Sequence, residues 1–294
     1  EGFSKRKAFE VLAPYLLISG AIYIFHRQAF KANIMSTAVL GTIQLAISQL
    51  SPKIVASLSL MFSKDFDPEE VAFGKADWER FFGEVGDVPS IPEGMAETLK
   101  ALCPFNPRKQ VGDTHMLVLI PKTVNNKPFN LNLLHELIQT SKQEKARANF
   151  HLYSEKVKAE LGEISPENSY WVLMTKDVIP GSQNKTYDYE KKLVHTKGKG
   201  RGSYKLPSAI EAAASILMHY FKTGERLYRE NPGTYTRCQE TVTEKVTQKQ
   251  CPVIIGSFSP YGLNVIYSFG SNSTEEGVAA VLDTIKMSIE TDFS

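Results

Sequence analysis

The chain has 294 residues, of which 42% are hydrophobic and 22% are charged, and this composition excludes a wholly disordered chain and a polytopic membrane protein. Its 34 Lys and Arg residues nearly balance its 32 Asp and Glu residues, so the net charge of +2 provides no whole-molecule field for binding nucleic acid. The three cysteines, Cys103, Cys238 and Cys251, form neither an even set nor a CxxC pair, which argues against a disulfide framework and favours a reducing compartment.

The N-terminal part contains two apolar stretches without charged residues, at 11–25 and 34–50, after the basic start Lys5-Arg6-Lys7. This pattern predicts a pair of helices. Each stretch is shorter than the roughly 20 apolar residues that a transmembrane helix needs. Two interpretations remain open: a pair of buried helices, or a hairpin on a membrane surface, which the positive flanks would favour at an anionic cytoplasmic face. The chain begins at Glu1 rather than Met, as a processed or partial chain would.

The next segment predicts a helix that begins at Asp67-Pro68-Glu69-Glu70, with Asp at the N-cap and Pro at the first helical position. It should run to Phe82 and stop at Gly83. Within it Trp78, Phe81 and Phe82 have i, i+3, i+4 spacing, and we expect this face to dock the helix on the rest of the domain. A shorter helix is predicted from Glu93 to Leu102 within a proline-rich stretch.

Two continuous apolar runs, Met116–Ile120 and Tyr170–Met174, predict buried β-strands. Between them Asn130 can cap a helix from Leu131 to Glu144, because its apolar residues keep helical spacing. The polar, Gly- and Lys-rich stretch from Gln183 to Lys205 has little apolar surface to bury, so it predicts a loop.

The C-terminal part contains a helix and several strands. Ser208-Ala209-Ile210-Glu211 is a capping box that should start a helix ending near Thr223, before Gly224. The rest is rich in β-branched and aromatic residues and predicts strands, followed by a last helix: strands at Thr234–Thr243, Val253–Phe258 and Leu263–Tyr267, and the helix at Glu275–Ile289.

This order of elements predicts an α+β fold, in which helices cover a mixed β-sheet. The strand after His115 and the strand around Trp171 should lie in one sheet. We expect the domain to occupy residues 63–294 and to be preceded by the apolar helical segment of residues 1–62.

Six segments, in consistent order, carry a resemblance to a known family: Gly74–Gly86, Cys103–Phe105, Asp113–Pro121, Ser169–Pro180, Tyr235–Glu240 and Val253–Phe258. Together they resemble an uncharacterised family of proteins in environmental chlamydiae, whose members are sometimes joined to F-box-like or leucine-rich-repeat regions. The resemblance implies a bacterial protein that acts on, or inside, a eukaryotic host. It implies no reaction. The apolar stretches within residues 11–50 also resemble those of chlamydial inclusion-membrane proteins.

The catalytic candidates are one cysteine and two histidines. Cys238 follows Arg237, and a thiol whose pKa is lowered by a neighbouring cation can act as a nucleophile. His115 or His219 could serve as its general base if the fold brings them together. The alternative is that Cys238 is a core cysteine and that both histidines are structural. The histidines show no HExxH or other ligand spacing, so the sequence predicts no metal site and no cofactor.

The binding candidates are charged residues that could form a functional surface. Three lie inside the segments that carry the resemblance, and three lie in the Gly- and Lys-rich stretch, where they could contact anionic groups: Asp177, Arg237 and Glu240, and Lys197, Lys199 and Arg201. Structural salt bridges and a solvated loop are the alternatives for the two sets.

Two functional hypotheses follow. The first is an effector-like interaction module that acts on a host protein without catalysis, in the host cytosol or at a membrane surface contacted through residues 11–50. The second is a cysteine-dependent hydrolase or transferase that uses Cys238 and a histidine. Neither hypothesis requires specific nucleic acid, a metal or a cofactor.

Overall fold

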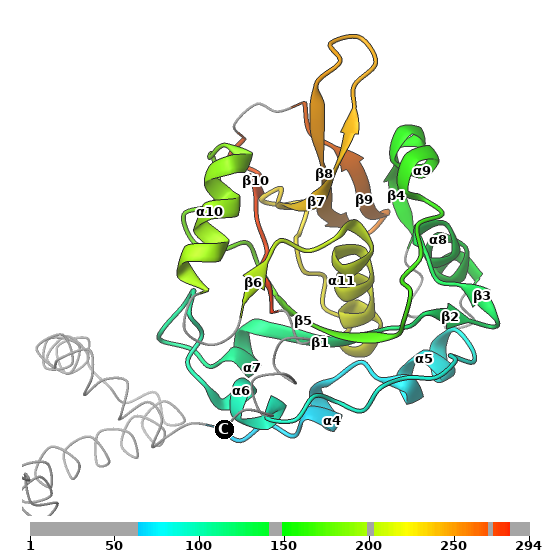
Figure 1. Ribbon diagram of the computed structural model, residues 1–294, viewed down its shortest axis with the longest axis vertical. Coiled ribbons are helices and arrows are strands. Elements are labelled where there is room, and N and C mark those ends of the chain that lie inside the picture. Colours follow the sequence, from blue (N-terminus) through cyan, green and yellow to red (C-terminus); the bar gives the residue numbers. More distant parts are fainter. Residues whose placement is uncertain (1–63, 141–148, 199–202, 270–272, 283–294) are drawn as a thin grey trace, which may run out of the picture. The chain divides into compact units, whose positions relative to one another are not determined.

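The computed structural model describes residues 64–140, 149–198, 203–269 and 273–282 (Figure 1). The chain divides into two compact units, 1–58 and 59–294, and all described residues belong to the second. The predicted apolar segment, including residues 11–50, lies outside the described residues. Within the described ranges, no helix is both long enough and apolar enough to cross a bilayer.

The first of the two main sheets is built on the two predicted apolar strands. It has the order β1-β5-β11-β6, with every neighbouring pair antiparallel, and its strands are β1 His115–Ile120, β5 Tyr170–Thr175, β11 Val281–Leu282 and β6 Tyr204–Lys205. Val118 lies opposite Val172 in the register of β1 and β5. Every residue of β1 is buried, which explains why the run shows no polar alternation.

The second main sheet contains the strands predicted in the C-terminal part. Its order is β10-β7-β8-β9-β4, and its strands are β10 Glu276–Gly277, β7 Tyr235–Thr243, β8 Gln250–Ser259, β9 Gly262–Tyr267 and β4 Phe150–Tyr153. The three central strands are antiparallel, whereas β10 and β4 join at the edges in parallel. The α+β class is therefore confirmed, but the single expected sheet is replaced by two, and by the small hairpin of β2 Thr123–Val124 and β3 Lys127–Pro128.

Helix α11, Ala209–Thr223, lies at the centre of the described fold and contacts strands of both main sheets (Figure 1). The predicted capping box is present: Ser208 Oγ accepts from the Glu211 amide at 3.2 Å, and Glu211 Oε2 accepts from the Ser208 amide at 2.6 Å. Gly224 ends the helix with a φ of 76°. Small residues such as Ala212 and Ala213 are fully buried, because β-strands pack closely on two sides of the helix.

The other helices of the described ranges surround this centre: α4 Pro68–Val71, α5 Lys75–Phe81, α6 Met95–Lys100, α7 Val111–Thr114, α8 Leu131–Thr140, α9 Glu155–Leu161 and α10 Tyr187–Lys197. Asn130 caps α8 as predicted, since its Oδ1 accepts from the Leu133 amide at 2.8 Å. The short helix predicted near Glu93 corresponds to α6.

The helix predicted from Asp67 to Phe82 is interrupted. Phe73 leaves helical geometry and pairs with the free edge of β1: its amide donates to the Leu117 carbonyl at 2.8 Å, and its carbonyl accepts from the Leu119 amide at 3.0 Å. The prediction of one continuous helix was wrong because a sheet edge competes for the backbone groups of Phe73. Two helices, α4 and α5, therefore flank a short extended segment.

Two further predictions fail for reasons that depend on tertiary contacts. The stretch predicted as a loop contains helix α10. Thr186 caps this helix by accepting a hydrogen bond from the Tyr189 amide, and the buried side chain of Val194 packs it against the domain. The last predicted helix is also wrong for residues 275–282, where β10 and β11 form. The apolar run Val278–Leu282 is buried, and β11 is inserted between β5 and β6, so both of its sides are paired. Residues 283–289 lie outside the described part.

Candidate functional site

Cys238 lies in β7 and its side chain is fully buried. Its Sγ is 4.0 Å from the Thr236 carbonyl oxygen, which accepts a weak hydrogen bond from the thiol. Burial raises the pKa of Cys238 well above its ordinary range, and the nearby carboxylates of Glu240 and Glu211 raise it further. A thiol that stays protonated and enclosed is a poor nucleophile.

The two candidate histidines have other neighbours than Cys238. His115 Nδ1 is 2.9 Å from Thr114 Oγ1, and its Nε2 is 3.4 Å from the Tyr204 hydroxyl. Burial lowers the pKa of His115 to about 3, so the ring is neutral at physiological pH. His219 Nε2 is 3.4 Å from Glu225 Oε2. The fold therefore does not join either imidazole to the cysteine.

Arg237 is enclosed between the second sheet and α10, with 2% of its side chain exposed. Its Nη1 is 2.8 Å from Glu190 Oε1, and its Nε and Nη2 donate to Glu276 Oε2 at 3.0 and 2.7 Å. Nη1 also donates to the Lys185 carbonyl. Burial raises the pKa of Glu190 to about 7, and the guanidinium acts in the opposite direction. These contacts fasten α10 and β10 to β7, and they turn the guanidinium inward.

The other described binding candidates do not converge with Arg237 on one surface. Glu240 Oε2 accepts from the Ala209 amide at 2.9 Å, so this carboxylate supports the start of α11. Asp177 is exposed and accepts from the Val178 amide at 2.7 Å. Lys197 is exposed at the end of α10 and donates to the Pro180 carbonyl at 3.3 Å. Lys199 and Arg201 lie outside the described residues.

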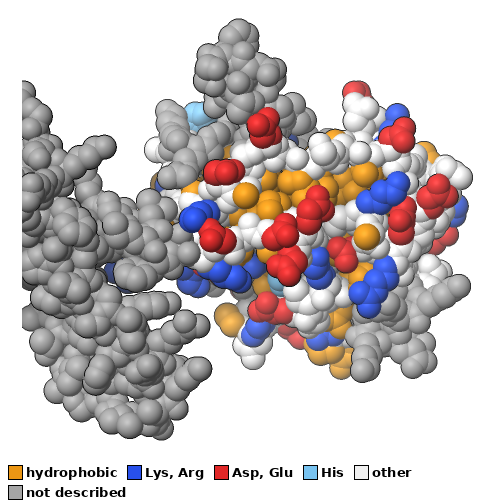
Figure 2. Space-filling view, turned by 90° about the horizontal axis from the view of Figure 1, so that it is seen from below, with side chains coloured by type: hydrophobic (Ala, Val, Ile, Leu, Met, Phe, Trp, Pro, Cys, Tyr) orange, Lys and Arg blue, Asp and Glu red, His pale blue; other side chains and the backbone are white. Residues whose placement is uncertain are grey.

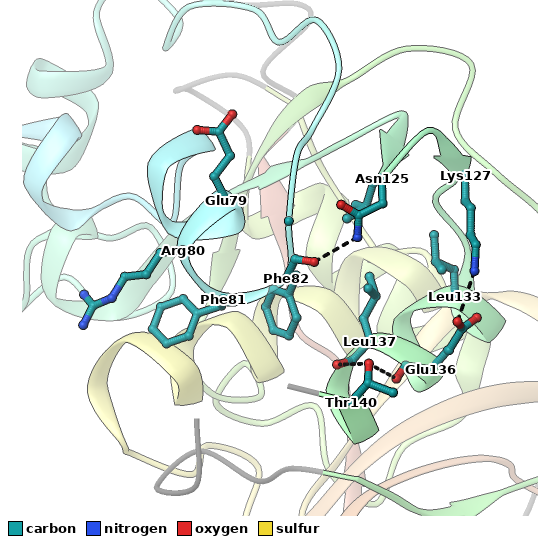
Figure 3. Close-up of a pocket in the computed structure, with 12 residues that line it drawn as sticks. Glu79, Arg80, Phe81, Phe82, Asn125, Lys127, Leu133, Glu136, Leu137 and Thr140 are labelled. Atoms are coloured by element: carbon teal, nitrogen blue, oxygen red, sulfur yellow. Dashed lines mark hydrogen bonds and ion pairs between the residues drawn. The ribbon is translucent and has the colours of Figure 1, made fainter. Parts of the chain in front are cut away.

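An open pocket of about 480 Å³ lies between α5 and α8, beside the β2–β3 hairpin (Figure 3). We call it the α5–α8 pocket. Figure 3 shows Phe82 on one side, with Leu133 and Leu137 of α8 on the other, and Thr140 at the end of that helix. The twelve residues around it are Glu79, Arg80, Phe81, Phe82, Gly83, Val124, Asn125, Lys127, Leu133, Glu136, Leu137 and Thr140.

The aromatic wall of the α5–α8 pocket is held in place from behind. The Phe82 ring is 4.8 Å from that of Phe221 in α11 and 5.4 Å from that of Trp78, measured between centroids. Trp78 is itself fully buried, and its Nε1 donates to the Leu119 carbonyl at 2.8 Å. Phe81 and Phe82 nevertheless remain only partly buried. The pocket therefore presents fixed aromatic surface to solvent.

The hairpin side of the pocket depends on a glycine. Asn125 Nδ2 donates to the Phe82 carbonyl at 3.0 Å. Gly83 has a φ of 122°, and a β-carbon at this position would collide with the Asn125 side chain. Only glycine adopts this conformation readily and leaves room for the side-chain amide of Asn125. The residues after α5 and the β2–β3 hairpin can therefore pack together as one wall of the pocket.

The rim of the pocket carries charges of both signs. Lys127 Nζ is 3.1 Å from Glu136 Oε1, and Glu79 and Arg80 project from α5 (Figure 3). On the face seen in Figure 2, acidic and basic side chains are likewise interspersed around a band of hydrophobic side chains. Exposed pairs of this kind contribute little net energy. The rim is neutral overall and does not select a partner of one charge.

The sequence pattern did not single out this pocket. Trp78, Phe81 and Phe82 were expected to dock their helix, and all three do so: Trp78 is fully buried, and Phe81 and Phe82 pack against Phe221 while remaining partly exposed. The aromatic residues of this stretch, with Phe73, do not fall on one helical stripe. Phe73 is nevertheless buried, because it leaves the helix to pair with β1, and the partly exposed rings are Phe81 and Phe82.

No protein-family model matches this chain, and no curated protein or solved structure is significantly similar to it. The candidate site is therefore judged by its chemistry. Within the described ranges, no group of three or more His, Cys, Asp or Glu side chains could hold a metal ion. The α5–α8 pocket offers apolar surface and a polar rim, which suit binding.

Proposed function

We propose that this chain is a non-catalytic interaction module that acts as an effector on a protein of a eukaryotic host, and that the α5–α8 pocket is where it binds. The host context rests on the resemblance to the chlamydial family. The binding role rests on one observation above all: half-buried aromatic rings in an open pocket are anchored from behind and left without a cover in the described structure.

The chemistry of the pocket indicates the kind of partner. Interfaces concentrate their binding energy in a few aromatic or aliphatic anchors that fill pockets, while a polar rim excludes water. A volume of about 480 Å³ lies within the usual range of ligand pockets and accommodates a bulky side chain with its flanking backbone. We expect a peptide segment of the host protein to insert a Leu, Phe or Trp side chain between Phe82 and Leu137.

The test uses short random peptides displayed on phage, selected against the whole chain. Thr140→Arg places a long cation at the pocket mouth without altering the buried core, because Thr140 is exposed at the end of α8. Thr196→Arg is the matched control, since Thr196 is exposed near the end of α10 and does not line the pocket.

We expect selected peptides to share a bulky apolar residue and to bind with micromolar affinity, measured by isothermal titration calorimetry. Thr140→Arg should weaken this binding at least about tenfold, and Thr196→Arg should not change it. Selection of no peptide, or equal binding to both variants, would contradict the proposal.

The absence of catalysis has a separate test. Cys238→Ala should leave peptide binding and the effect of the chain on host cells unchanged, because the thiol is enclosed and lacks an imidazole partner in the described structure. Circular dichroism and thermal unfolding check that the variant is folded. Loss of the cellular effect in a folded Cys238→Ala protein would favour a cysteine-dependent enzyme instead.

A further inference from the structure

A second pocket, of about 350 Å³, lies on a different part of the domain and shares no lining residue with the α5–α8 pocket. Its walls come from the segment that begins at Lys64, from α4, α7 and β1, and from the last turns of α11. Lys176, which follows β5, completes it. We call it the Lys176 pocket.

The floor of the Lys176 pocket is apolar. Phe73, Val118 and Met218 line it and are almost completely buried. Phe66 extends this surface toward the rim, and the Lys64 ammonium lies 5.0 Å from the centre of the Phe66 ring. Val71 of α4 also lines the pocket and is 36% exposed, so the apolar surface open to a hydrocarbon or aromatic body lies mainly at Phe66 and Val71, above this floor.

Lys176 and Lys222 both line the pocket, but they differ in whether a carboxylate compensates their charge. Lys222 Nζ is 3.3 Å from Asp77 Oδ2 and also donates to the Ala72 carbonyl, so its charge is compensated. Lys176 Nζ donates to the Asp113 carbonyl at 3.2 Å, and within the described residues no carboxylate comes within ion-pair distance of it. Its side chain is only partly exposed. A partly desolvated ammonium without a counter-ion is unfavourable, and an incoming anion would relieve that cost.

The charges around Lys176 are of both signs, and the lining residues include the carboxylates of Glu70 and Asp113. Burial is the largest effect that lowers the pKa of Lys176, and Lys64 and Lys109 lower it further, whereas the carboxylates of Asp113 and Glu225 oppose them. Burial also lowers the pKa of His219, so this ring on the pocket wall is neutral at physiological pH. A neutral imidazole can share a hydrogen bond with a bound acid.

We infer that the Lys176 pocket binds a small amphipathic acid, with its anionic headgroup at Lys176 and its apolar body against Phe66 and Val71. This site is independent of the proposed function, because its position and the chemical class of its ligand both differ from those of the α5–α8 pocket.

The experiment measures binding of three eight-carbon probes to the full chain by calorimetry: octanoate, octyl phosphate and the neutral octan-1-ol. We expect at least one of the two anions to bind with a Kd below about 1 mM and octan-1-ol to bind at least about tenfold more weakly. The tighter of the two anions identifies the preferred headgroup.

Substitutions then locate the headgroup. Lys176→Gln should weaken anion binding about tenfold and leave the weak binding of octan-1-ol unchanged, whereas Lys176→Arg should retain the anion. Lys192→Gln is the control, because Lys192 is exposed on α10 outside the pocket. Equal binding of octan-1-ol and the anions, or unchanged anion binding by Lys176→Gln, would overturn the inference.

A measurement on the unaltered chain covers the case in which Lys176→Gln fails to fold. Met116 and Met218 line the pocket, whereas Met95 of α6 is buried and does not line it. The bound anion should shift the methyl NMR signals of Met116 and Met218 and not that of Met95. Shifts confined to other methionines, or no shifts at all, would place the ligand elsewhere or exclude it.

Discussion

In the buried centre around Arg237 a charged side chain is enclosed, whereas in the α5–α8 pocket an aromatic side chain is exposed. Each is the reverse of what the residue type suggests. Arg237 is charged, yet its donors are bound to Glu190, Glu276 and a carbonyl oxygen inside the domain. Phe82 is apolar, yet part of its ring faces solvent. Availability therefore decides which residues can bind a partner: a polar group with internal partners has few free donors, whereas an anchored ring that faces solvent can contact a partner.

The largest expected effect comes from removing the guanidinium. Arg237→Ala leaves two carboxylates in a buried site without their cation, which should lower the free energy of unfolding by about 3–5 kcal/mol. Chemical denaturation followed by circular dichroism measures this. Arg229→Ala is the matched control: Arg229 is 64% exposed and lies 3.5 Å from Glu225, so its loss should cost less than about 0.5 kcal/mol. Equal, small losses for both arginines would remove the contrast between the two regions.

An intermediate effect concerns pH and the buried ring of His115. Its pKa is about 3 in the folded protein against an ordinary value of 6.5, so the unfolded chain binds more protons between these values. Stability should therefore fall as the pH drops through this range, by about 2–3 kcal/mol at pH 4.5 from this group alone.

His115→Gln keeps polar atoms near Thr114 and Tyr204 but does not titrate. Its free energy of unfolding should decline less than that of the unaltered chain between about pH 7.5 and 4.5, measured by urea denaturation. Because all other groups are shared, the difference reports His115 alone. Identical declines in the two proteins would show that the ring is not enclosed as described.

The smallest expected effect on stability lies at the pocket mouth. Thr140→Arg and Thr196→Arg should each change the free energy of unfolding by less than about 0.5 kcal/mol, because both positions are exposed. Thermal unfolding checks this. A large loss for Thr140→Arg alone would mean that its effect on peptide binding reflects damage to the fold.

The parts of the fold that could be predicted depend on local signals. The continuous apolar runs of β1 and β5 have the length and composition of buried strands, and the capping box at Ser208 with Gly224 defines both ends of α11. These elements form the centre of the domain, so the α+β class followed from them.

The rest depends on partners distant in sequence. The backbone of Phe73 joins the edge of β1, and β11 is inserted between β5 and β6, although its sequence alone also fits a helix. Of the candidate site residues, Asp177 and Lys197 are exposed, and the burial of Arg237 depends on α10 and β10, which were not predicted. The α5–α8 pocket is formed by three segments that are separate in sequence, α5, the β2–β3 hairpin and α8, and no local sequence pattern predicts that they come together.

Photo-cross-linking tests the α5–α8 pocket as the binding site: the apolar anchor of a selected peptide is replaced by benzoylphenylalanine, and mass spectrometry locates the adducts. We expect adducts on Phe82, Leu133 or Leu137, and their loss in Thr140→Arg. Adducts concentrated on the outer faces of α9 or α10, with none in the α5–α8 pocket, would contradict it.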